Sequence, residues 1–565
     1  MAFEETPEDS FDGERKTVTT VFADIKGSMD LIEDLDPEEA RAIVDPAMRL
    51  MIDAVHRYDG YVVQSTGDGV FAMFGAPAAH EDHAQRALYA GLRMQEEMRK
   101  YSARLREKGD PPVEIRVGVN TGEVVVRRIR TGDAQVEYAP VGHATSLASR
   151  MQTMAPTGAI VVTQHTHRLT AGYFDFKPLG PTRVKGASEP VEIFEVIGVG
   201  PLRTRLQMSA TRGLSRFVGR QAEIEHLRKS LEMAREGHGQ IVAAVAEAGV
   251  GKSRLFHEFK LIAQFGCLVL EAVSVSHGKA SSYLPVVELL KVYFRISDQD
   301  DADLRREKIT GKVFALDRAL EDTTPYLFAL LGVPVVDVAL DEMDPAVRRR
   351  RTRDAIKRLI LRETLRQPLI LIFEDLHWID EESQALLDLL ADSIGTARLL
   401  MMVNYRPEYR HFWGTKTYYA RLRLDPLGGP MAAEMLSALL GDPPELKTLK
   451  EMIIERTEGN PFFMEEMVQV LFDEGVLVRE VSIKLARPLA SVHVPPTVKG
   501  ILAARIDRLA PAAKALLQTL AVIGKEFPIG LIRRVTRKPE EDLATLLSVL
   551  QLGEFLYEQP AVADS

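Results

Sequence analysis

Apolar and polar residues in the N-terminal third of the chain alternate in a way that predicts a succession of strands and helices. The β-branched and aromatic residues at 17–24 predict a buried strand, and apolar residues at helical spacing within 35–60 predict a helix. The segments YVVQS and VFAMF then flank a Thr-Gly-Asp-Gly sequence at 66–69, which is typical of a β-hairpin turn. A second helical pattern and a strand at 113–126 follow. This order, β-α-β-β-α-β, predicts a ferredoxin-like sheet with its helices on one face.

The pattern changes after residue 198. The segment GPLRTRLQMSATRGLSR lacks periodicity and predicts a linker. Residues 241–259 then give a strand, a glycine-rich loop and a helix, and residues 368–380 give a buried strand that ends in acidic residues. This combination predicts a P-loop α/β domain. Helical spacing at 426–474 predicts a small helical lid, and helices followed by a short strand at 495–560 predict a winged helix.

We therefore expect an α/β multidomain protein. The expected parts are a disordered N-terminus (1–13), the ferredoxin-like domain (14–198), a linker (199–213), the P-loop domain (214–425), the helical lid domain (426–490) and a winged-helix-like domain (491–565). The chain stops at Ser565 soon after the last predicted strand, so we expect the architecture to continue beyond it.

Two carboxylates stand at strand ends in the ferredoxin-like domain. Asp24 ends the first predicted strand and Asp68 sits at the tip of the central hairpin. In this topology the two strands lie side by side, so we expect both carboxylates and the Ile25 carbonyl to form an oxygen site for a hard cation such as Mg²⁺. Taken singly, Asp68 is better read as a turn residue and Asp24 as a helix N-cap. As a pair on adjacent strands, they favour the metal.

The sequence AEAGVGKS at 246–253 is a Walker A loop with alanine at its first glycine position. Backbone amides of such a loop, which includes Gly249 and Gly251 here, cradle phosphates at a helix N-terminus. Lys252 is expected to reach the β- and γ-phosphates and Ser253 to hold Mg²⁺. Ala246 is harmless if its φ is negative and costly if its φ is positive.

Composition excludes several classes of protein. The formal net charge of −10 and a pI near 5.8 argue against a general nucleic-acid binder, and the RRRRTR run at 348–353 is more often a solvated helix face. The single cysteine, Cys267, rules out an internal disulfide framework. The acidic start has no signal-peptide core, and no apolar run is long enough to span a membrane. We expect a cytoplasmic protein with no membrane or nucleic-acid partner.

Residues 14–198 resemble the class III nucleotidyl cyclase catalytic domain. The motifs that carry the resemblance are VFADIKGS, STGDGVFAMF, IRVGVNTGEVVV, VGHATSLASRM and RVKG, in the family's order. The resemblance implies a head-to-tail homodimer with active sites at the interface, which converts ATP to cyclic AMP and pyrophosphate. It also implies that Asp24 and Asp68 bind two metal ions, Mg²⁺ or Mn²⁺, in a clamp on an in-line displacement.

The same resemblance assigns further residues and exposes departures. Arg150 matches the family's transition-state arginine, and Lys185 matches the lysine that contacts the terminal phosphates. Gln64 stands where adenylyl cyclases often have an adenine-reading lysine, and Ala139 stands where its Asp or Thr partner is usual. Ser146 replaces the asparagine that orients the ribose, and losing one such contact can cost about 10²- to 10³-fold in rate.

Residues 214–555 resemble the signal-transducing ATPases with numerous domains, through FVGR, LILIFEDLHWID, NYRPE and EGNPFF. That resemblance implies that Glu374 contacts the Mg²⁺ shell and that Asp375 polarises the attacking water. It further implies that Arg406 senses the γ-phosphate and that Pro461 lies near adenine. In such fusions the ATPase is commonly regulatory.

The leading hypothesis is an adenylate cyclase regulated by a fused ATP-binding module, with room for an unidentified protein regulator. The alternative is a pseudocyclase that binds nucleotide without turnover and signals through its ATPase. A winged-helix transcription regulator is a weaker third reading.

Overall fold

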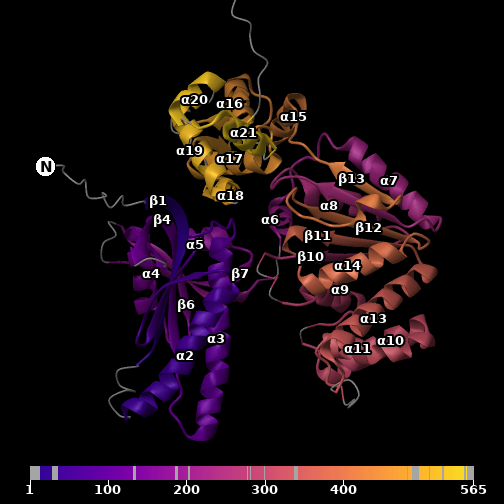
Figure 1. The fold of residues 1–565 in the computed structure, drawn as a ribbon, viewed down its shortest axis with the longest axis horizontal. Helices are drawn as coiled ribbons and strands as arrows, with labels where there is room; N and C mark the ends of the chain where they lie inside the picture. Colours follow the sequence, from indigo (N-terminus) through magenta and orange to yellow (C-terminus); the bar gives the residue numbers. More distant parts are fainter. Residues whose placement is uncertain are drawn as a thin grey trace, which may run out of the picture. The chain divides into compact units, whose positions relative to one another are not determined.

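The computed structural model describes residues 13–27, 36–131, 135–184, 189–200, 204–276, 278–279, 281–297, 299–335, 342–479, 482–486, 496–507, 509–524, 527–536, 538–552 and 555–556. The chain divides into two compact units (Figure 1). The first unit comprises residues 1–199 together with 496–565, and the second comprises residues 200–495.

The first unit is built on an eight-stranded sheet of order β2-β3-β1-β4-β6-β8-β7, with β5 paired to β4. Its strands are β1 (Gly13–Ile25), β2 (Tyr61–Thr66), β3 (Gly69–Phe74), β4 (Ile115–Thr131), β5 (Gln135–Val141), β6 (Ile160–Thr163), β7 (Phe174–Thr182) and β8 (Val191–Val199). Its first helices are α2 (Pro37–Arg57), α3 (His83–Lys108), α4 (His143–Met154) and α5 (Gln164–Thr170). The β-α-β-β-α-β order at the start of the chain is the predicted one.

The central hairpin is also confirmed. β2 and β3 pair antiparallel with Thr66 opposite Gly69, so that Gly67 and Asp68 form the two-residue turn. β1 runs antiparallel between β3 and β4, with Asp24 opposite Gly69 on one side and opposite Arg116 on the other. This register brings the end of β1 beside the hairpin tip.

The prediction of helices on one face holds for the two helices of the motif, α2 and α3, which pack together where the Tyr101 hydroxyl donates to the Ile43 carbonyl oxygen at 3.0 Å. A third helix, α4, follows the motif and covers the other face. α3 covers the face of β4 that carries Val117, since a Cβ added to its Gly91 would lie 3.7 Å from the Val117 side chain. α4 lies on the opposite face, against Gly118 and Gly122. A Cβ on Gly118 would lie 1.9 Å from the Gln152 nitrogen and 2.3 Å from the Ala148 oxygen. Two glycines four residues apart in β4 therefore let the backbone of α4 pack directly against the strand.

The C-terminal part of the first unit is helical, with α18 (Pro496–Asp507), α19 (Pro511–Ile523), α20 (Ile529–Thr536) and α21 (Glu540–Leu552). Asp507 at the end of α18 accepts hydrogen bonds from Lys16 Nζ (2.6 Å), Lys514 Nζ (2.7 Å) and the Ala79 amide (3.0 Å). The strand expected after these helices falls largely on 553–560, of which the structure describes only 555 and 556.

The second unit has a parallel sheet of order β10-β11-β12-β9-β13. Its strands are β9 (Gln240–Val245), β10 (Leu268–Val273), β11 (Leu369–Glu374), β12 (Leu399–Tyr405) and β13 (Tyr419–Arg423). Alternate residues of β9 face opposite ways. Val242 and Ala244 pack with α7 (Gln221–Arg235) and α8 (Lys252–Ala263), whereas Ile241 and Ala243 pack with α9 (Leu284–Phe294), α13 (Pro345–Arg366) and α14 (Glu381–Ser393). This is the predicted P-loop α/β arrangement.

The remaining elements of the second unit complete this description. α10 (Ala302–Leu316), η1 (Arg318–Thr323) and α11 (Thr324–Leu330) precede α13. Two short 3₁₀ turns, η2 (Leu376–Trp378) and η3 (Trp413–Thr415), follow β11 and β12 respectively. The predicted linker contains a helix, α6 (Arg205–Arg212). The Thr204 side chain and the Gln207 side chain form a reciprocal capping box there. A Thr-x-x-Gln signal therefore starts a helix where periodicity gave none.

The residues predicted as a helical lid form α15 (Gly429–Leu440), η4 (Pro444–Leu446), α16 (Lys447–Thr457) and α17 (Pro461–Asp473), followed by the hairpin β14 (Leu477–Arg479) and β15 (Ile483–Leu485). These helices share a core that includes Leu436, Leu449, Ile453, Met464 and Leu471. We refer to residues 429–473 as the α15–α17 segment.

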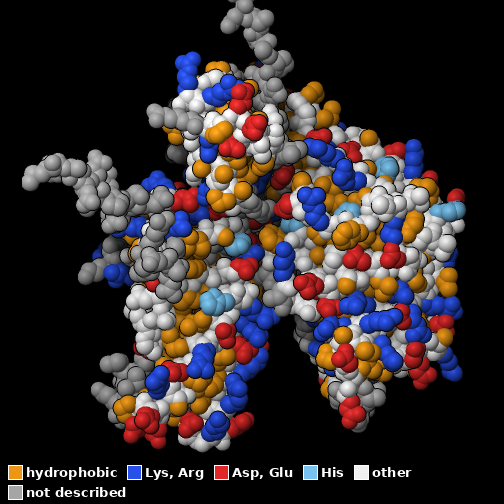
Figure 2. Space-filling view, in the orientation of Figure 1, with side chains coloured by type: hydrophobic (Ala, Val, Ile, Leu, Met, Phe, Trp, Pro, Cys, Tyr) orange, Lys and Arg blue, Asp and Glu red, His pale blue; other side chains and the backbone are white. Residues whose placement is uncertain are grey.

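The arginine run falls at the start of α13 and is mostly exposed, as predicted. Further along the helix, Arg358 pairs with Asp322 at 2.7 Å and Arg362 pairs with Asp317 at 2.7 Å. Figure 2 shows basic and acidic side chains interspersed around α13 on the visible face of this unit. In the part of the chain that the structure describes, no helix combines the length and the apolar character needed to cross a bilayer.

We predict that Gly118→Ala destabilises the first unit by about 3 kcal/mol or more, because the added methyl group meets the backbone of α4 rather than a side chain that can move. Gly198→Ala is the matched control, since a Cβ there meets nothing within 4 Å. Urea unfolding, with hydrogen exchange of the β4 amides as a local reporter, measures both. Equal stability of the two variants would contradict the close approach of α4.

Candidate functional site

The two predicted metal aspartates meet at one end of the first sheet. The Ile25 amide donates a hydrogen bond of 2.9 Å to the carbonyl oxygen of Asp68, which fixes the hairpin turn against the end of β1. Asp24 lies next to this contact and is half-buried, as is Asp68. The structure therefore places the two residues side by side, as the topology predicts.

The Asp24 carboxylate is held by two residues that the sequence analysis did not single out. Its Oδ2 accepts a hydrogen bond of 3.0 Å from Arg116 and one of 2.9 Å from the Gln152 side chain. Arg116 lies opposite Asp24 on β4, and Gln152 comes from α4. Both contacts engage the same oxygen, and together they orient the carboxylate.

α4 also carries Ser146 and Arg150, one helical turn apart. Ser146 is exposed. Arg150 is half-buried, and its Nε is buried without a hydrogen-bond partner among the described residues. A guanidinium with an unused donor suits an anionic ligand, because the buried N–H gains a partner when the anion binds.

The two positions expected to read the base lie on strands that touch. Gln64 is exposed on β2, opposite Phe71, and Ala139 is half-buried on β5. The strands meet where the Tyr138 amide donates to the Tyr61 hydroxyl at 3.2 Å. Lys185 lies outside the described residues.

The P-loop of the second unit leaves β9 and enters α8. Gly249 has a φ of +83° and Gly251 a φ of +108°, values that L side chains rarely adopt. Ala246 is not among the residues with positive φ, so alanine is tolerated at this first position of the motif. The loop therefore keeps glycine at the positions where its backbone requires it.

Lys252 and Ser253 are the first two residues of α8. The buried Lys252 ammonium donates to the carbonyl oxygens of Ala246 (2.8 Å) and Glu247 (3.0 Å). Ser253 hydrogen-bonds the Glu374 carboxylate, so the ends of the loop and of β11 meet as predicted. Burial and the nearby charge of Asp375 raise the pKa of Glu374 to about 7. The hydrogen bonds from Ser253 and Asn404 lower this pKa, but by less than the other two effects raise it.

Asn404, at the end of β12, is a further residue that the sequence analysis missed. β12 lies between β9 and β11, and Asn404 is fully buried. Its Nδ2 donates to Glu374 Oε2 at 3.1 Å, and its Oδ1 accepts from the Asp375 amide at 2.8 Å. One amide thus fixes the Glu374 side chain and the backbone of Asp375, whose φ is +56°. The signal was available, because asparagine is the first letter of the NYRPE motif.

Two other predicted residues lie at the same end of the sheet. Arg406 follows β12, is buried, and stacks its guanidinium on the Trp378 ring at 6.0 Å. Pro461 is the first residue of α17 and comes directly after Asn460, which contacts the P-loop. The structure therefore gathers the predicted P-loop, Glu374, Asp375, Arg406 and Pro461 around the carboxyl ends of parallel strands, where ligands of open α/β sheets bind.

Comparison with known proteins assigns these two regions. Residues 12–198 match the model of the adenylate and guanylate cyclase catalytic domain, and residues 216–403 match that of the AAA ATPase domain. The chain carries a nucleotide cyclase domain and an AAA ATPase domain.

Two bacterial relatives illustrate the match. An uncharacterized protein of Rhizobium meliloti is 25% identical over 548 residues, which are 92% of this chain and 50% of that protein. Adenylate cyclase 1 of the same organism is 31% identical over 193 residues, which are 33% of this chain and 28% of that protein. The chain thus spans half or less of the length of these relatives.

Part of the chain is also similar to solved structures. The guanylyl cyclase Cya2 is 30% identical, with a TM-score of 0.32, over 34% of this chain and 95% of that one. The adenylyl cyclase CyaB from P. aeruginosa is 28% identical, with a TM-score of 0.32, over 34% of this chain and 100% of that one.

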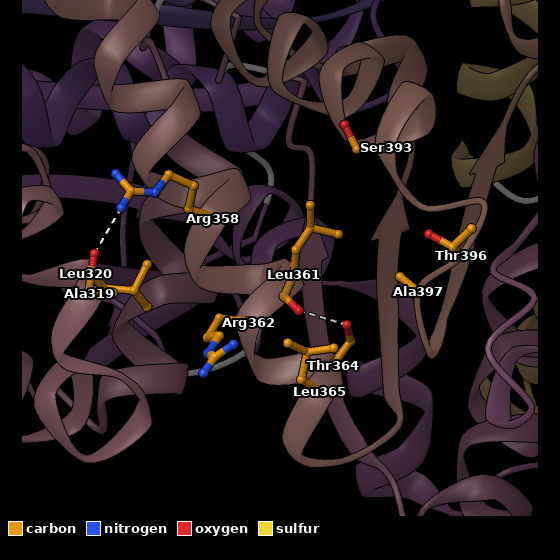
Figure 3. Close-up of a pocket in the computed structure, with 10 residues that line it drawn as sticks. All are labelled: Ala319, Leu320, Arg358, Leu361, Arg362, Thr364, Leu365, Ser393, Thr396 and Ala397. Atoms are coloured by element: carbon orange, nitrogen blue, oxygen red, sulfur yellow. Dashed lines mark hydrogen bonds between the residues drawn. The ribbon is translucent and has the colours of Figure 1, made fainter.

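A separate pocket of about 420 Å³ opens in the AAA ATPase unit (Figure 3). It is lined from η1, α13, the end of α14 and the turn before β12. Arg358 in its wall donates to the Ala319 carbonyl oxygen at 2.9 Å, and Arg362 pairs with Asp317. The pocket lies near the amino ends of β11 and β12, at the edge of the sheet opposite the P-loop.

We predict strong coupling between Asn404 and Glu374. Asn404→Leu leaves the buried Glu374 carboxylate and the Asp375 amide without these partners and should cost about 1–3 kcal/mol of stability. Glu374→Gln carries no charge, so the same substitution should cost less in that background. A double-mutant cycle of urea unfolding measures the difference. Simple additivity would show that the hydrogen bond contributes nothing of its own.

Proposed function

We propose that the cyclase domain converts ATP to cyclic AMP and pyrophosphate and that the ATP-binding AAA module regulates it. The placement of Asp24 beside Asp68 is the observation that supports catalysis most directly. The relative named adenylate cyclase, at 31% identity, supports ATP as the substrate.

The residues present fit divalent cations. Asp24 and Asp68 supply carboxylate oxygens and Ile25 supplies a carbonyl at the same strand end, and Mg²⁺ or Mn²⁺ prefers such hard ligands completed by substrate phosphates. Among the described residues, no group of three or more His, Cys, Asp or Glu side chains is placed to hold a metal ion. We propose two ions at each cyclase site, and one Mg²⁺ held by Ser253 and Glu374 at the P-loop.

In the proposed step, the ribose 3′-oxygen forms a bond to the α-phosphorus while the bond from that phosphorus to the pyrophosphate oxygen breaks. The hydroxyl proton passes to solvent and pyrophosphate leaves. When bound, the cations would activate the hydroxyl and hold the triphosphate. Arg150 would neutralise the charge that grows on the α-phosphate, and Arg116 and Gln152 would keep Asp24 oriented.

We propose that two copies assemble head to tail, with each active site at the interface. Phe22 and Phe71 support this assembly, because their rings stack at 4.3 Å and both remain half-buried within one copy. Phe22 and Asp24 share one face of β1 because they are two residues apart. A partner covering the two rings would also cover the metal end of the strand.

Base selection is the weakest part of the proposed site. Gln64 offers one exposed amide, and Ala139 has no polar side chain to support it. A site that makes few hydrogen bonds to a base discriminates weakly against its analogues. We therefore propose ATP as the preferred substrate with measurable turnover of GTP.

The test of this function is cyclic nucleotide formation by the purified chain. We predict that Asp24→Asn and Asp68→Asn each abolish cyclic AMP formation from ATP with Mg²⁺ or Mn²⁺, whereas Asp53→Asn, at an exposed position on α2, has no effect. If the site is shared between two copies, mixing Asp24→Asn with Arg150→Ala chains restores part of the activity. Undiminished product from either metal-site variant would refute the two-metal mechanism.

The Ser146 position separates a weakened enzyme from a pseudocyclase. We predict that Ser146→Asn raises kcat by up to roughly 10²-fold with little change in KM, because the restored contact to the ribose acts mainly in the transition state. The gain should disappear when Asp24→Asn is added. Activity that stays at zero while nucleotide binds would favour a nucleotide sensor that signals through the ATPase.

A further inference from the structure

Every carbonyl oxygen along the first part of the P-loop has a donor. Lys252 Nζ binds those of Ala246 and Glu247. The next three are bound from outside the loop and its helix: that of Ala248 by Asn460 Nδ2 at 3.0 Å, that of Gly249 by the Phe462 amide at 3.2 Å, and that of Val250 by Arg220 Nη2 at 3.3 Å.

This arrangement fixes the direction of the loop's peptides. A peptide group whose carbonyl is held on one side turns its N–H to the other, and successive N–H groups that share one concave side form an anion site. The donors from outside therefore hold the loop in the conformation that binds phosphate. Without these donors, the loop would lose conformational entropy when the nucleotide binds, and this loss would weaken the binding.

The outside donors come from the α15–α17 segment or are joined to its base. Asn460 and Phe462 lie at the start of α17. Arg220 is buried, and its Nη2 also donates to the carbonyl oxygen of Asp425 at 2.6 Å, just before that segment begins. The Leu427 amide in turn donates to the Gly459 carbonyl at 2.9 Å, which closes the base of the segment onto the residue before Asn460.

Asn460 uses both ends of its amide. Its Oδ1 caps α17 by accepting from the Phe463 amide at 3.3 Å, while its Nδ2 reaches the loop. The side chain is buried, and a Cβ on Gly249 would lie 2.6 Å from its Oδ1. Residue 249 must therefore be glycine for two reasons: its φ is positive, and a Cβ would overlap the Asn460 side chain.

We propose that Asn460 and Arg220 are positioning residues that latch the α15–α17 segment onto the P-loop, so that triphosphate binds tightly only while the segment is docked. By linkage, bound triphosphate stabilises the docked segment to the same extent. This inference rests on the proposed binding of ATP at the P-loop. It adds a mechanical connection between that site and the helices that follow the sheet.

Asn460→Ser tests the latch. Serine caps helices about as well as asparagine but lacks the amide that reaches Ala248. We predict that MgATP affinity at the P-loop falls about tenfold, as expected for the loss of one hydrogen bond from a buried carbonyl. Hydrogen exchange of the loop peptide 246–253 in the full chain, followed during a MgATP titration, reports this site separately from the cyclase site. Asp301→Ser is the matched control. Asp301 caps α10 by accepting a hydrogen bond from the Leu304 amide, so this substitution also replaces a capping side chain with serine.

A second readout distinguishes a latch from a merely structural residue. In the wild-type chain MgATP should slow exchange in α15–α17 as well as in the loop. In Asn460→Ser at saturating MgATP, the loop should regain protection while α17 gains much less. Arg220→Lys, which keeps the charge but reaches one carbonyl instead of two, should show the same pattern to a smaller degree.

Unchanged affinity and unchanged protection of α17 in Asn460→Ser would overturn the latch. Lys252→Ala separates that outcome from failure of the proposed ATP site. If MgATP protects the wild-type loop and Lys252→Ala removes this protection, the site exists and only the latch is under test. If the wild-type loop gains no protection at millimolar MgATP, the proposed ATP site is wrong and the latch with it.

Discussion

A glycine whose missing Cβ leaves room for a close neighbour is the constraint on which both sites depend. At Gly118 the absent Cβ lets α4 sit directly on β4, which brings Gln152 to Asp24. At Gly249 the absent Cβ admits the Asn460 side chain to the P-loop. A methyl group at Gly118 would overlap the backbone of α4, and one at Gly249 would overlap the side chain of Asn460. Each site is therefore set by main-chain geometry before any ligand arrives.

Electrostatics then differs between the two sites. The cyclase carboxylate Asp24 is half-buried and has a cationic partner in Arg116. Glu374 of the ATPase is buried beside another carboxylate, and the hydrogen bonds that reach it come from the neutral groups of Asn404 and Ser253. Burial without a cation is why its pKa is raised.

Local patterns in the sequence were sufficient for the elements but not for the contacts between them. The hairpin at Asp68 and the P-loop were predictable because turn chemistry and glycine spacing act within a few residues. The packing of α4 was not predictable, because it depends on contacts of Gly118 and Gly122 with a helix some thirty residues further along the chain. Gln152 and Asn460 were missed for the same reason: their partners lie 128 and 212 residues distant along the chain.

The hydrogen bonds that join the P-loop to α17 also limit how strongly one site can influence another. A ligand shifts a conformational equilibrium only by the difference between its affinities for the two states. If the docked and undocked forms of the α15–α17 segment differ at the loop by the Asn460, Phe462 and Arg220 contacts, the difference amounts to three hydrogen bonds, or about 1.5–4.5 kcal/mol. That suits a graded adjustment of activity by ATP. An all-or-none switch would require about 5.5 kcal/mol, and hence further contacts that also change with the nucleotide.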